Sequence, residues 1–230
     1  MLTAADVMTT GVITVTPETA IHEIAKLLCD HHISGVPVIG DEEQLLGIVS
    51  EGDLIGHARL AGEQRRSWWQ TFLSGPMALA QHYAKSHGRA ASDVMTENVV
   101  TVVETTSVAD TARALEQHRI KRVPVLRDGK FVGIVTRSNL LQVLATTDVS
   151  KPMNVADRII RERLNDELED QPWACLPSMN IVVENGVVHL FGIVQSEEER
   201  HAIRLAAENQ AGVKAVEDHL SIVPATAYVF

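Results

Sequence analysis

The sequence predicts an α+β fold in which two copies of one βαββα unit are followed by a smaller αββαβ unit. The main observation is an internal repeat: the tetrapeptide Asp-Val-Met-Thr at residues 6–9 returns at residues 93–96, which is 87 residues later. The strand that contains Pro37 returns around Pro124, again at a spacing of 87. A repeat that aligns at two separate points outranks any single motif in deciding the fold.

Each copy has the same order of expected elements. A short strand opens the copy, at residues 12–15 in the first and 99–102 in the second. A helix follows, because apolar side chains recur at helical spacing, and Thr19 and Thr106 are the residues expected to start it. Two strands and a second helix complete the copy. One copy of about 55 residues would bury too little apolar surface alone, so the two copies are expected to share a core.

The second helix of each copy opens on a hydroxyl residue that is followed, three positions later, by an acid or its amide. The first copy has Ser50 and Asp53 here, and the second has Thr136 and Asn139. Together with the Val-Pro-Val strand and the Gly-Ile-Val run before the hydroxyl residue, this pattern resembles the cystathionine-β-synthase (CBS) domain. The resemblance implies a CBS pair, with its two copies related by a pseudo-twofold axis.

The resemblance also implies a ligand, an adenine nucleotide such as ATP, ADP or AMP, or S-adenosylmethionine. In the family the hydroxyl and carboxylate hold the ribose, and a carboxylate can accept two hydrogen bonds from the ribose diol. Each cleft takes its ribose-binding residues from one copy and its pre-proline residues from the other. The expected ligand-binding residues are Ser50, Asp53, Val100, Lys121 and Arg122 in the first cleft, and Ile13, Ser34, Gly35, Thr136 and Asn139 in the second.

The two expected clefts differ in charge. Lys121 and Arg122 give the first cleft two cations where phosphates would lie, and the second has none at the equivalent positions. Because each charge-assisted hydrogen bond contributes roughly 1.5–3 kcal/mol, a phosphorylated nucleotide is expected in the first cleft. The second is expected to be empty or to hold an uncharged adenosyl moiety. A purely structural alternative makes Asp53 a helix-terminus residue and the two cations a solvated strand edge.

The segment between the copies has its own pattern. Trp68, Trp69, Phe72 and Leu73 fall on one helical face behind two arginines. This face is expected to cover the CBS pair or to form a dimer contact. The alternative is an anchor for a membrane interface or a partner, because basic residues beside tryptophans suit lipid headgroups.

The C-terminal part predicts helix, hairpin, helix and strand. Asn154 and Ser196 are expected to cap the two helices, Asn185-Gly186 is a strong hairpin signal, and the last strand is expected at residues 213–223. This αββαβ order resembles a BON domain. That family is associated with membrane contact, which implies an unknown protein partner or a membrane surface, although the many acids on these helices match anionic lipid poorly.

Composition and motifs restrict the function classes. A net charge of −10 and a pI near 5.4 disfavour non-specific nucleic-acid binding. Two cysteines, Cys29 and Cys175, suggest neither a disulfide framework nor a metal cluster. No signal peptide or apolar run of about 20 residues is recognised, so a cytoplasmic location is expected. The histidines follow no metal-ligand spacing, and no catalytic motif is found, so no catalytic residue, metal or required cofactor is expected.

The sequence therefore predicts a non-catalytic regulatory sensor that binds an adenosyl ligand, relays its occupancy to the BON domain or a partner, and forms a homodimer through the CBS pair. The alternative is a ligand-free scaffold or membrane-associated adaptor that acts through the Trp68-Trp69 segment and the BON domain. The expected parts are CBS repeat 1 (residues 1–56), a helical insertion (57–89), CBS repeat 2 (90–146), a linker (147–152) and the BON domain (153–224).

Overall fold

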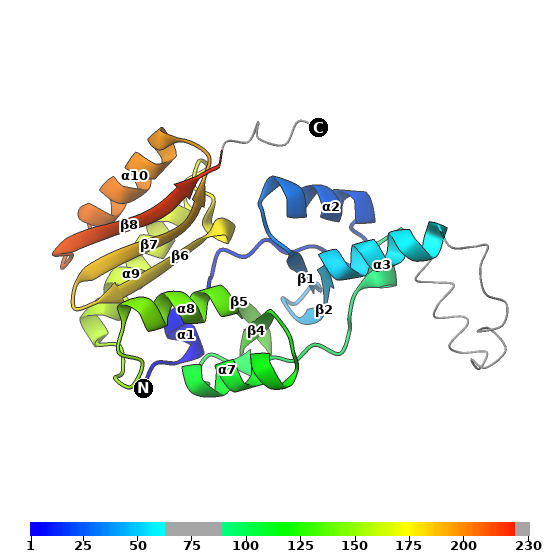
Figure 1. Cartoon of the computed structure of the whole chain (residues 1–230), viewed down its shortest axis with the longest axis horizontal. Coiled ribbons are helices and arrows are strands. Elements are labelled where there is room, and N and C mark those ends of the chain that lie inside the picture. The colour runs from blue at the N-terminus through cyan, green and yellow to red at the C-terminus, as the bar shows by residue number, and fades with distance from the viewer. Residues whose placement is uncertain (63–88, 224–230) are drawn as a thin grey trace. The chain divides into compact units, whose positions relative to one another are not determined.

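The computed structural model describes residues 1–62 and 89–223 of the chain. The chain divides into two compact units. The N-terminal unit is Ile13–Val99, and the C-terminal unit combines Met1–Val12 with Val100–Phe230. The expected helix around Trp68 and Trp69 lies outside the described residues. Figure 1 labels the elements in chain order.

The N-terminal unit has a two-stranded antiparallel sheet and helices that cover it. Its elements are α2 (Ile21–Asp30), β1 (Gly35–Ile39), β2 (Leu45–Ser50), α3 (Glu51–Gly62) and α6 (Ala91–Val94). Ile24 and Leu28 of α2 are buried against Val36 and Val49 of the strands. The strand expected at residues 12–15 is wrong in extent, because only Val15 pairs there, in a single parallel bridge to β1.

The second copy lies in the C-terminal unit and has a three-stranded sheet in the order β3-β4-β5. Its elements are β3 (Val102–Val103), α7 (Val108–Gln117), β4 (Arg122–Arg127), β5 (Lys130–Thr136) and α8 (Arg137–Thr146). Strand β3 is parallel to β4, and β4 is antiparallel to β5. As in the first copy, the second helix begins directly after the hydroxyl residue at the end of a strand.

The expected starting residues of the first helices are wrong by one position. Ser107 caps α7, and its hydroxyl accepts a hydrogen bond of 3.0 Å from the backbone N–H of Asp110. Thr106 instead accepts from the backbone of Val103, at 3.1 Å. In the first copy the capping position is likewise one residue after Thr19. The threonines close the preceding turn, which is a competing use of a short hydroxyl side chain.

The segments that open the two copies are exchanged between the sheets. Helix α1 (Ala4–Val7) and Met8 are buried in the core of the second copy, and Thr9 forms paired backbone hydrogen bonds of 2.9 and 3.0 Å with Ile134 of β5. Correspondingly, α6 is buried in the core of the first copy, and Thr96 pairs with Ile48 of β2. Each repeat therefore completes its core with the opening segment of the other repeat. The segment formed by residues 1–12 is called the exchanged segment below.

Gly133 of β5 allows the close approach of the exchanged segment. A Cβ atom at this position would lie 2.7 Å from Met8 Sδ and 2.8 Å from the carbonyl oxygen of Thr9. We expect Gly133→Ala to lower the free energy of unfolding by about 1–3 kcal/mol, the usual cost of overpacking, as measured by urea denaturation. Gly56→Ala is the control, because that helical glycine has no neighbouring atom within 4 Å and should gain about 0.5–1 kcal/mol. Equal stability of the two variants would contradict this packing.

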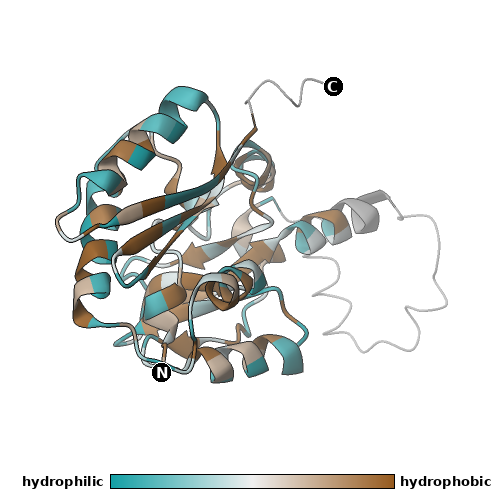
Figure 2. Ribbon diagram, turned by 60° about the vertical axis from the view of Figure 1, so that its left-hand side comes forward, coloured by the Kyte–Doolittle hydropathy of each residue, from teal (hydrophilic) through white to brown (hydrophobic). Residues whose placement is uncertain are grey.

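The C-terminal part of the chain forms a three-stranded sheet in the order β6-β7-β8, with β7 antiparallel to β6 and parallel to β8. Its elements are α9 (Val155–Glu169), the 3-10 helix η1 (Leu176–Ser178), β6 (Met179–Glu184), β7 (Val187–Val194), α10 (Glu197–Glu208) and β8 (Ala215–Ile222). Apolar residues of α9 and α10 pack on one face of this sheet. Figure 2 shows hydrophilic and hydrophobic residues alternating along these helices, as expected for amphipathic helices.

The local signals of this part are confirmed. Asn154 accepts a hydrogen bond of 2.8 Å from the backbone at the start of α9, and Ser196 accepts one of 3.1 Å at the start of α10. Asn185 and Gly186 both have positive φ, 54° and 81°, as the favoured two-residue hairpin turn requires. The αββαβ order and the α+β class are therefore as predicted.

Candidate functional site

Ser50 and Asp53 lie together at the start of α3. Asp53 Oδ2 accepts hydrogen bonds from the backbone N–H of Ser50 at 2.8 Å and from its hydroxyl at 2.6 Å. The other carboxylate oxygen, Oδ1, has a long contact of 3.5 Å from the hydroxyl of Thr96. The carboxylate therefore caps the helix with one oxygen. Asp53 is half-buried, and its second oxygen could accept hydrogen bonds from a ligand diol.

Thr136 and Asn139 repeat this geometry at the start of α8. Asn139 Oδ1 accepts from the backbone and hydroxyl of Thr136 at 2.7 and 2.6 Å. Asn139 is only 3% exposed, and its Nδ2 donates to the hydroxyl of Thr9 at 3.3 Å. That hydroxyl in turn donates to the carbonyl oxygen of Met179 in β6, at 3.4 Å. In the second copy the Asn139 amide therefore donates to the hydroxyl of Thr9, whereas in the first copy the hydroxyl of Thr96 donates to Asp53.

The pre-proline residues lie beside the hydroxyl residue of their own copy. Gly35 pairs with Ser50 across β1 and β2, and Arg122 pairs with Thr136 across β4 and β5. Lys121 is exposed and Arg122 is half-buried. Both copies therefore present a helix start, a hydroxyl residue and the pre-proline backbone at one end of their sheet.

The cross-copy pairing of the clefts stays a prediction. For the first cleft, Ser50 and Asp53 belong to the N-terminal unit, whereas Val100, Lys121 and Arg122 belong to the C-terminal unit. For the second cleft, Ile13, Ser34 and Gly35 belong to the N-terminal unit, whereas Thr136 and Asn139 belong to the C-terminal unit. Within each copy the structure brings Ser50 to Asp53 and Thr136 to Asn139, whereas Val100 and Ile13 pack against the core clusters of their own units.

Sequence reasoning missed a buried arginine that ties the exchanged segment to the C-terminal domain. Arg161 of α9 is 6% exposed. Its guanidinium donates to the carbonyl oxygens of Ile181 at 2.9 Å, of Ala5 at 3.0 Å and of Met8. Burial lowers the pKa of Arg161 to about 10, with the Asp6 carboxylate opposing the shift, so the group is charged at neutral pH. No spacing rule links a helical arginine to carbonyl groups that precede it by about 150 residues.

A second arginine of α9 supports the same contact. Arg158 donates to Asp6 Oδ1 through Nη2 at 2.7 Å and through Nε at 3.1 Å. Asp6 is 2% exposed, and its other oxygen accepts from the backbone and hydroxyl of Thr3 at 2.9 Å each. We call Arg158, Arg161 and the groups they bind in residues 5–8, namely the Asp6 carboxylate and the carbonyl oxygens of Ala5 and Met8, the arginine clamp. It fixes α1 against α9 within the C-terminal unit.

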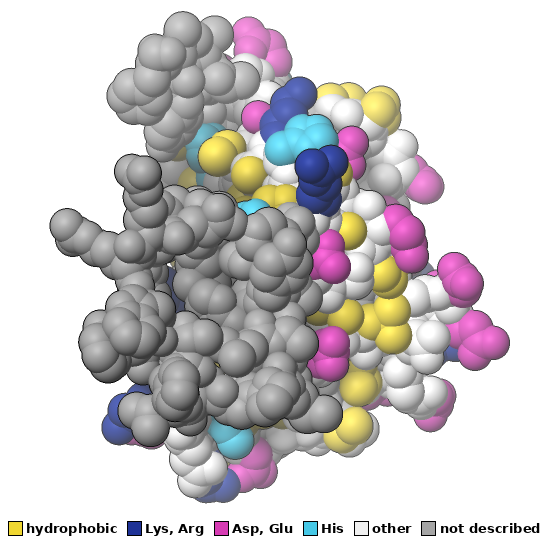
Figure 3. Space-filling model, turned by 90° about the vertical axis from the view of Figure 1, so that its right-hand side faces the viewer, with side chains coloured by type: hydrophobic (Ala, Val, Ile, Leu, Met, Phe, Trp, Pro, Cys, Tyr) yellow, Lys and Arg dark blue, Asp and Glu magenta, His cyan; other side chains and the backbone are white. Residues whose placement is uncertain are grey.

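The described surface is acidic in part and has no candidate membrane span. Figure 3 shows acidic side chains scattered over the described surface on the face that it displays. Among the described helices, none combines the length and the apolar character that crossing a bilayer requires.

A small hollow lies in the C-terminal unit between the exchanged segment and α9. Its lining includes Thr9, Arg161 and Asn165 but none of the predicted ligand-binding residues.

Comparison with known families agrees with this architecture. A CBS-domain model matches residues 4–59 and 91–146, and a BON-domain model matches residues 156–224. The chain is a CBS-pair protein with a C-terminal BON domain. The exchanged opening segments and the two helix starts therefore belong to the CBS pair. The arginine clamp joins the BON domain to residues 5–8, which open the first repeat and pack in the core of the second.

Relatives of known identity match the CBS pair. The chain is 34% identical to the chloroplastic CBS domain-containing protein CBSX1 of Arabidopsis thaliana and 32% identical to CBSX2, covering 57% and 56% of those proteins with 56% of its own length. It thus spans a little over half the length of these curated relatives. A crystal structure of CBSX2 in complex with AMP aligns with a TM-score of 0.54 and 32% identity, over 63% of this chain and 97% of that chain.

Proposed function

We propose that this CBS-pair protein is a non-catalytic regulator that binds an adenine nucleotide in the CBS pair and relays its occupancy to the BON domain or to a partner. The observation that carries the proposal is the likeness to CBSX2, whose structure was determined with AMP. The geometry of Ser50 and Asp53 gives further support, because the oxygen of Asp53 that does not cap α3 is suited to a ribose diol.

The chemistry of the proposed cleft favours a phosphorylated ligand. The N-terminus of α3 offers backbone N–H groups and positive potential, and the proposed cleft adds the cations Lys121 and Arg122. We expect an affinity between micromolar and millimolar, roughly −4 to −8 kcal/mol, as suits a sensor of abundant metabolites. Arg122→Ala should weaken the binding of ATP more than that of adenosine, because only ATP carries phosphates for the lost cation.

A continuous set of contacts supports the proposed relay. The side chain of Asn139 at the second helix start reaches the BON strand β6 through two hydrogen bonds, by way of Thr9. The arginine clamp holds the same exchanged segment against α9. A ligand transmits its occupancy only if it prefers one arrangement of this segment over another. The relay is therefore proposed to run from the CBS pair through residues 1–12 to the BON domain.

The central test compares two variants by isothermal titration with AMP, ATP and S-adenosylmethionine. Asp53→Ala should weaken the binding of the preferred ligand by about tenfold or more, since a charge-assisted contact contributes about 1.5–3 kcal/mol. Asp110→Ala is a closely matched control, because Ser107 and Asp110 have the same spacing and also pair at a helix start, at 2.7 Å. Its binding should be unchanged.

Two outcomes would count against the proposal. Equal loss of affinity in both variants would assign the effect to helix capping rather than to ligand contact. No binding of any adenosyl ligand at millimolar concentration by the folded chain would remove the sensor function. Co-sedimentation with liposomes would then favour the adaptor alternative.

The proposed homodimer is tested separately, by light scattering with and without nucleotide.

A further inference from the structure

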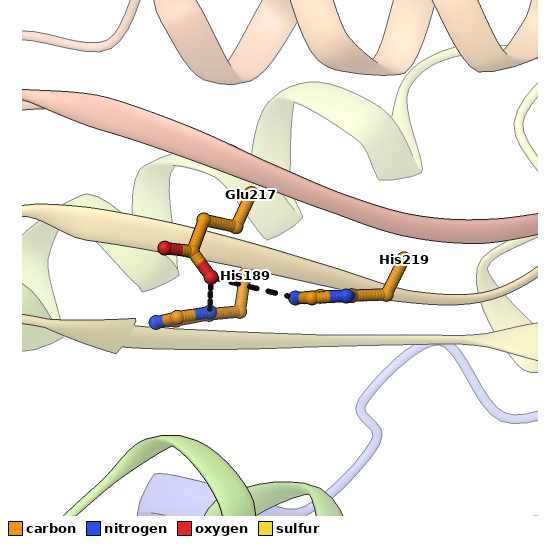
Figure 4. Close-up of side chains that lie close together, drawn as sticks. All are labelled: His189, Glu217 and His219. Carbon is orange, nitrogen blue, oxygen red and sulfur yellow. Dashed lines mark ion pairs between the residues drawn. The ribbon is translucent and has the colours of Figure 1, made fainter.

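The BON sheet has a second face, opposite the face that α9 and α10 cover. Side chains alternate along a strand, so His189 of β7 and Glu217 of β8, which are paired in register, lie on this face. His219 follows two residues after Glu217 and is paired with Phe191. Figure 4 shows the Glu217 carboxylate directed toward both imidazole rings. Three side chains with metal-binding atoms therefore converge on adjacent strands.

Two of the distances in this cluster are close to those between neighbouring ligand atoms of a metal ion. Glu217 Oε2 lies 3.2 Å from His189 Nδ1 and 3.6 Å from His219 Nε2. The three potential ligand atoms all lie within 4.8 Å of one another. In a tetrahedral zinc site with bonds of about 2.0–2.1 Å, neighbouring ligand atoms are roughly 3.3 Å apart. The planes of the two imidazole rings are 8° apart, so an ion would bind once the rings turn and direct their lone pairs toward the Glu217 carboxylate.

One atom of the cluster lacks the partner that its burial demands. His189 is 7% exposed, and its Nδ1 has no hydrogen bond of acceptable geometry in the described structure, although Glu217 is close. A buried polar atom without a partner is uncommon in native proteins and calls for a specific explanation, such as an ion.

A neighbouring aromatic ring restricts one of the proposed ligands, and two of the three ligands are accessible to solvent. The ring of Phe191 stacks on that of His219, with centroids 4.6 Å apart and planes 10° apart, which limits the orientation of the imidazole. The side chains of Glu217 and His219 are 56% and 42% exposed. Solvent can therefore supply the remaining ligands of an ion, as in sites with three protein ligands and an open position.

We propose that His189, Glu217 and His219 form a binding site for a divalent transition-metal ion of the zinc class. Two imidazole nitrogens and one carboxylate oxygen are a donor set that suits such ions. The bound ion would fasten β8, the edge strand of the BON sheet, to the central strand β7. The sequence predicted no metal ligands, since His189 meets the other two only through strand pairing.

The test uses the full chain after treatment with a chelator. Titration with Co²⁺ and Zn²⁺ should show one saturable site, and Zn²⁺ should raise the melting temperature. His219→Ala and Glu217→Gln should each lower the affinity by about tenfold or more, at least the loss seen when a supporting residue of a metal site is changed. His201→Ala is the control, because His201 is an exposed histidine of α10 outside the cluster, and it should bind as the unmodified chain does.

Three results would overturn the site. The first is no saturable binding of either ion, and the second is the same affinity in the cluster variants as in the His201 control. The third is an intense cobalt–thiolate absorption band, which would place the ion on Cys29 or Cys175 instead. Because Glu217 and His219 are exposed, circular dichroism of their variants should match that of the unmodified chain, so lost binding would report on ligation rather than on folding.

Discussion

Arg161→Met is expected to lower the free energy of unfolding of the C-terminal unit by about 3–5 kcal/mol, the usual cost of breaking a buried charged network. Methionine keeps much of the length of the side chain but donates no hydrogen bond. The carbonyl groups of Ala5, Met8 and Ile181 would each lose the guanidinium, and a buried acceptor left unpaired costs roughly 1–3 kcal/mol. Urea denaturation gives the loss of stability, and hydrogen exchange at residues 4–9 shows whether the exchanged segment is released.

Arg163→Met is the matched control for this variant. Arg163 lies on the same helix two residues further on, and it is exposed, so its replacement should change stability by no more than about 0.5 kcal/mol. If the two variants unfold alike, Arg161 does not hold the segment. If Arg161→Met keeps its affinity for AMP while binding no longer alters hydrogen exchange in the BON domain, the proposed relay through the arginine clamp is supported.

Gly192→Ala is expected to cost about 3 kcal/mol or more, because it adds a backbone clash to conformational strain. Gly192 of β7 has φ of +139°, where side chains are rarely tolerated. A Cβ atom there would lie 2.3 Å from the carbonyl oxygen of Ser178 and 2.8 Å from the Cα of Met179. Both are backbone atoms, so no side-chain rotation can relieve the contact. Urea denaturation of the full chain measures the loss.

Gly129→Ala separates the two contributions. Gly129 also has a positive φ, of +82°, but no atom lies within 4 Å of a Cβ built there. Its replacement should therefore show the strain alone, about 1–2 kcal/mol. If Gly192→Ala cost no more than Gly129→Ala, then η1 would not pack against β7 as closely as the structure has it.

Much of the fold could be predicted from local signals. The capping by Asn154 and Ser196 and the turn at Asn185-Gly186 were confirmed, since each depends on side chains within three residues of the backbone they affect. The helix starts at Ser50 and Thr136 were also as expected. The first strand of each copy was predicted less well, because its pairing partner is distant in the chain and its own residues give only a weak signal.

The candidate site was predictable only in the part that one copy supplies. The spacing from Ser50 to Asp53 puts hydroxyl and carboxylate on one helical turn, and the structure has them in contact. The spacing from Thr136 to Asn139 did not predict the hydrogen bond that Asn139 makes to the exchanged segment. Its amide donates to Thr9, so the residue that looks like a weakened ribose ligand is also a packing contact of the exchanged segment.

The sequence by itself determined the duplicated CBS unit, the BON domain after it and the starts of α3, α8, α9 and α10, because periodicity, capping and turn chemistry act over a few residues. Only the tertiary structure decided that each repeat borrows the opening segment of the other, that Arg161 binds the backbone around α1, and that His189 meets Glu217 and His219. These contacts join residues that are remote in the chain, and their free energy comes from close packing and from pairing buried polar groups, which no local pattern records.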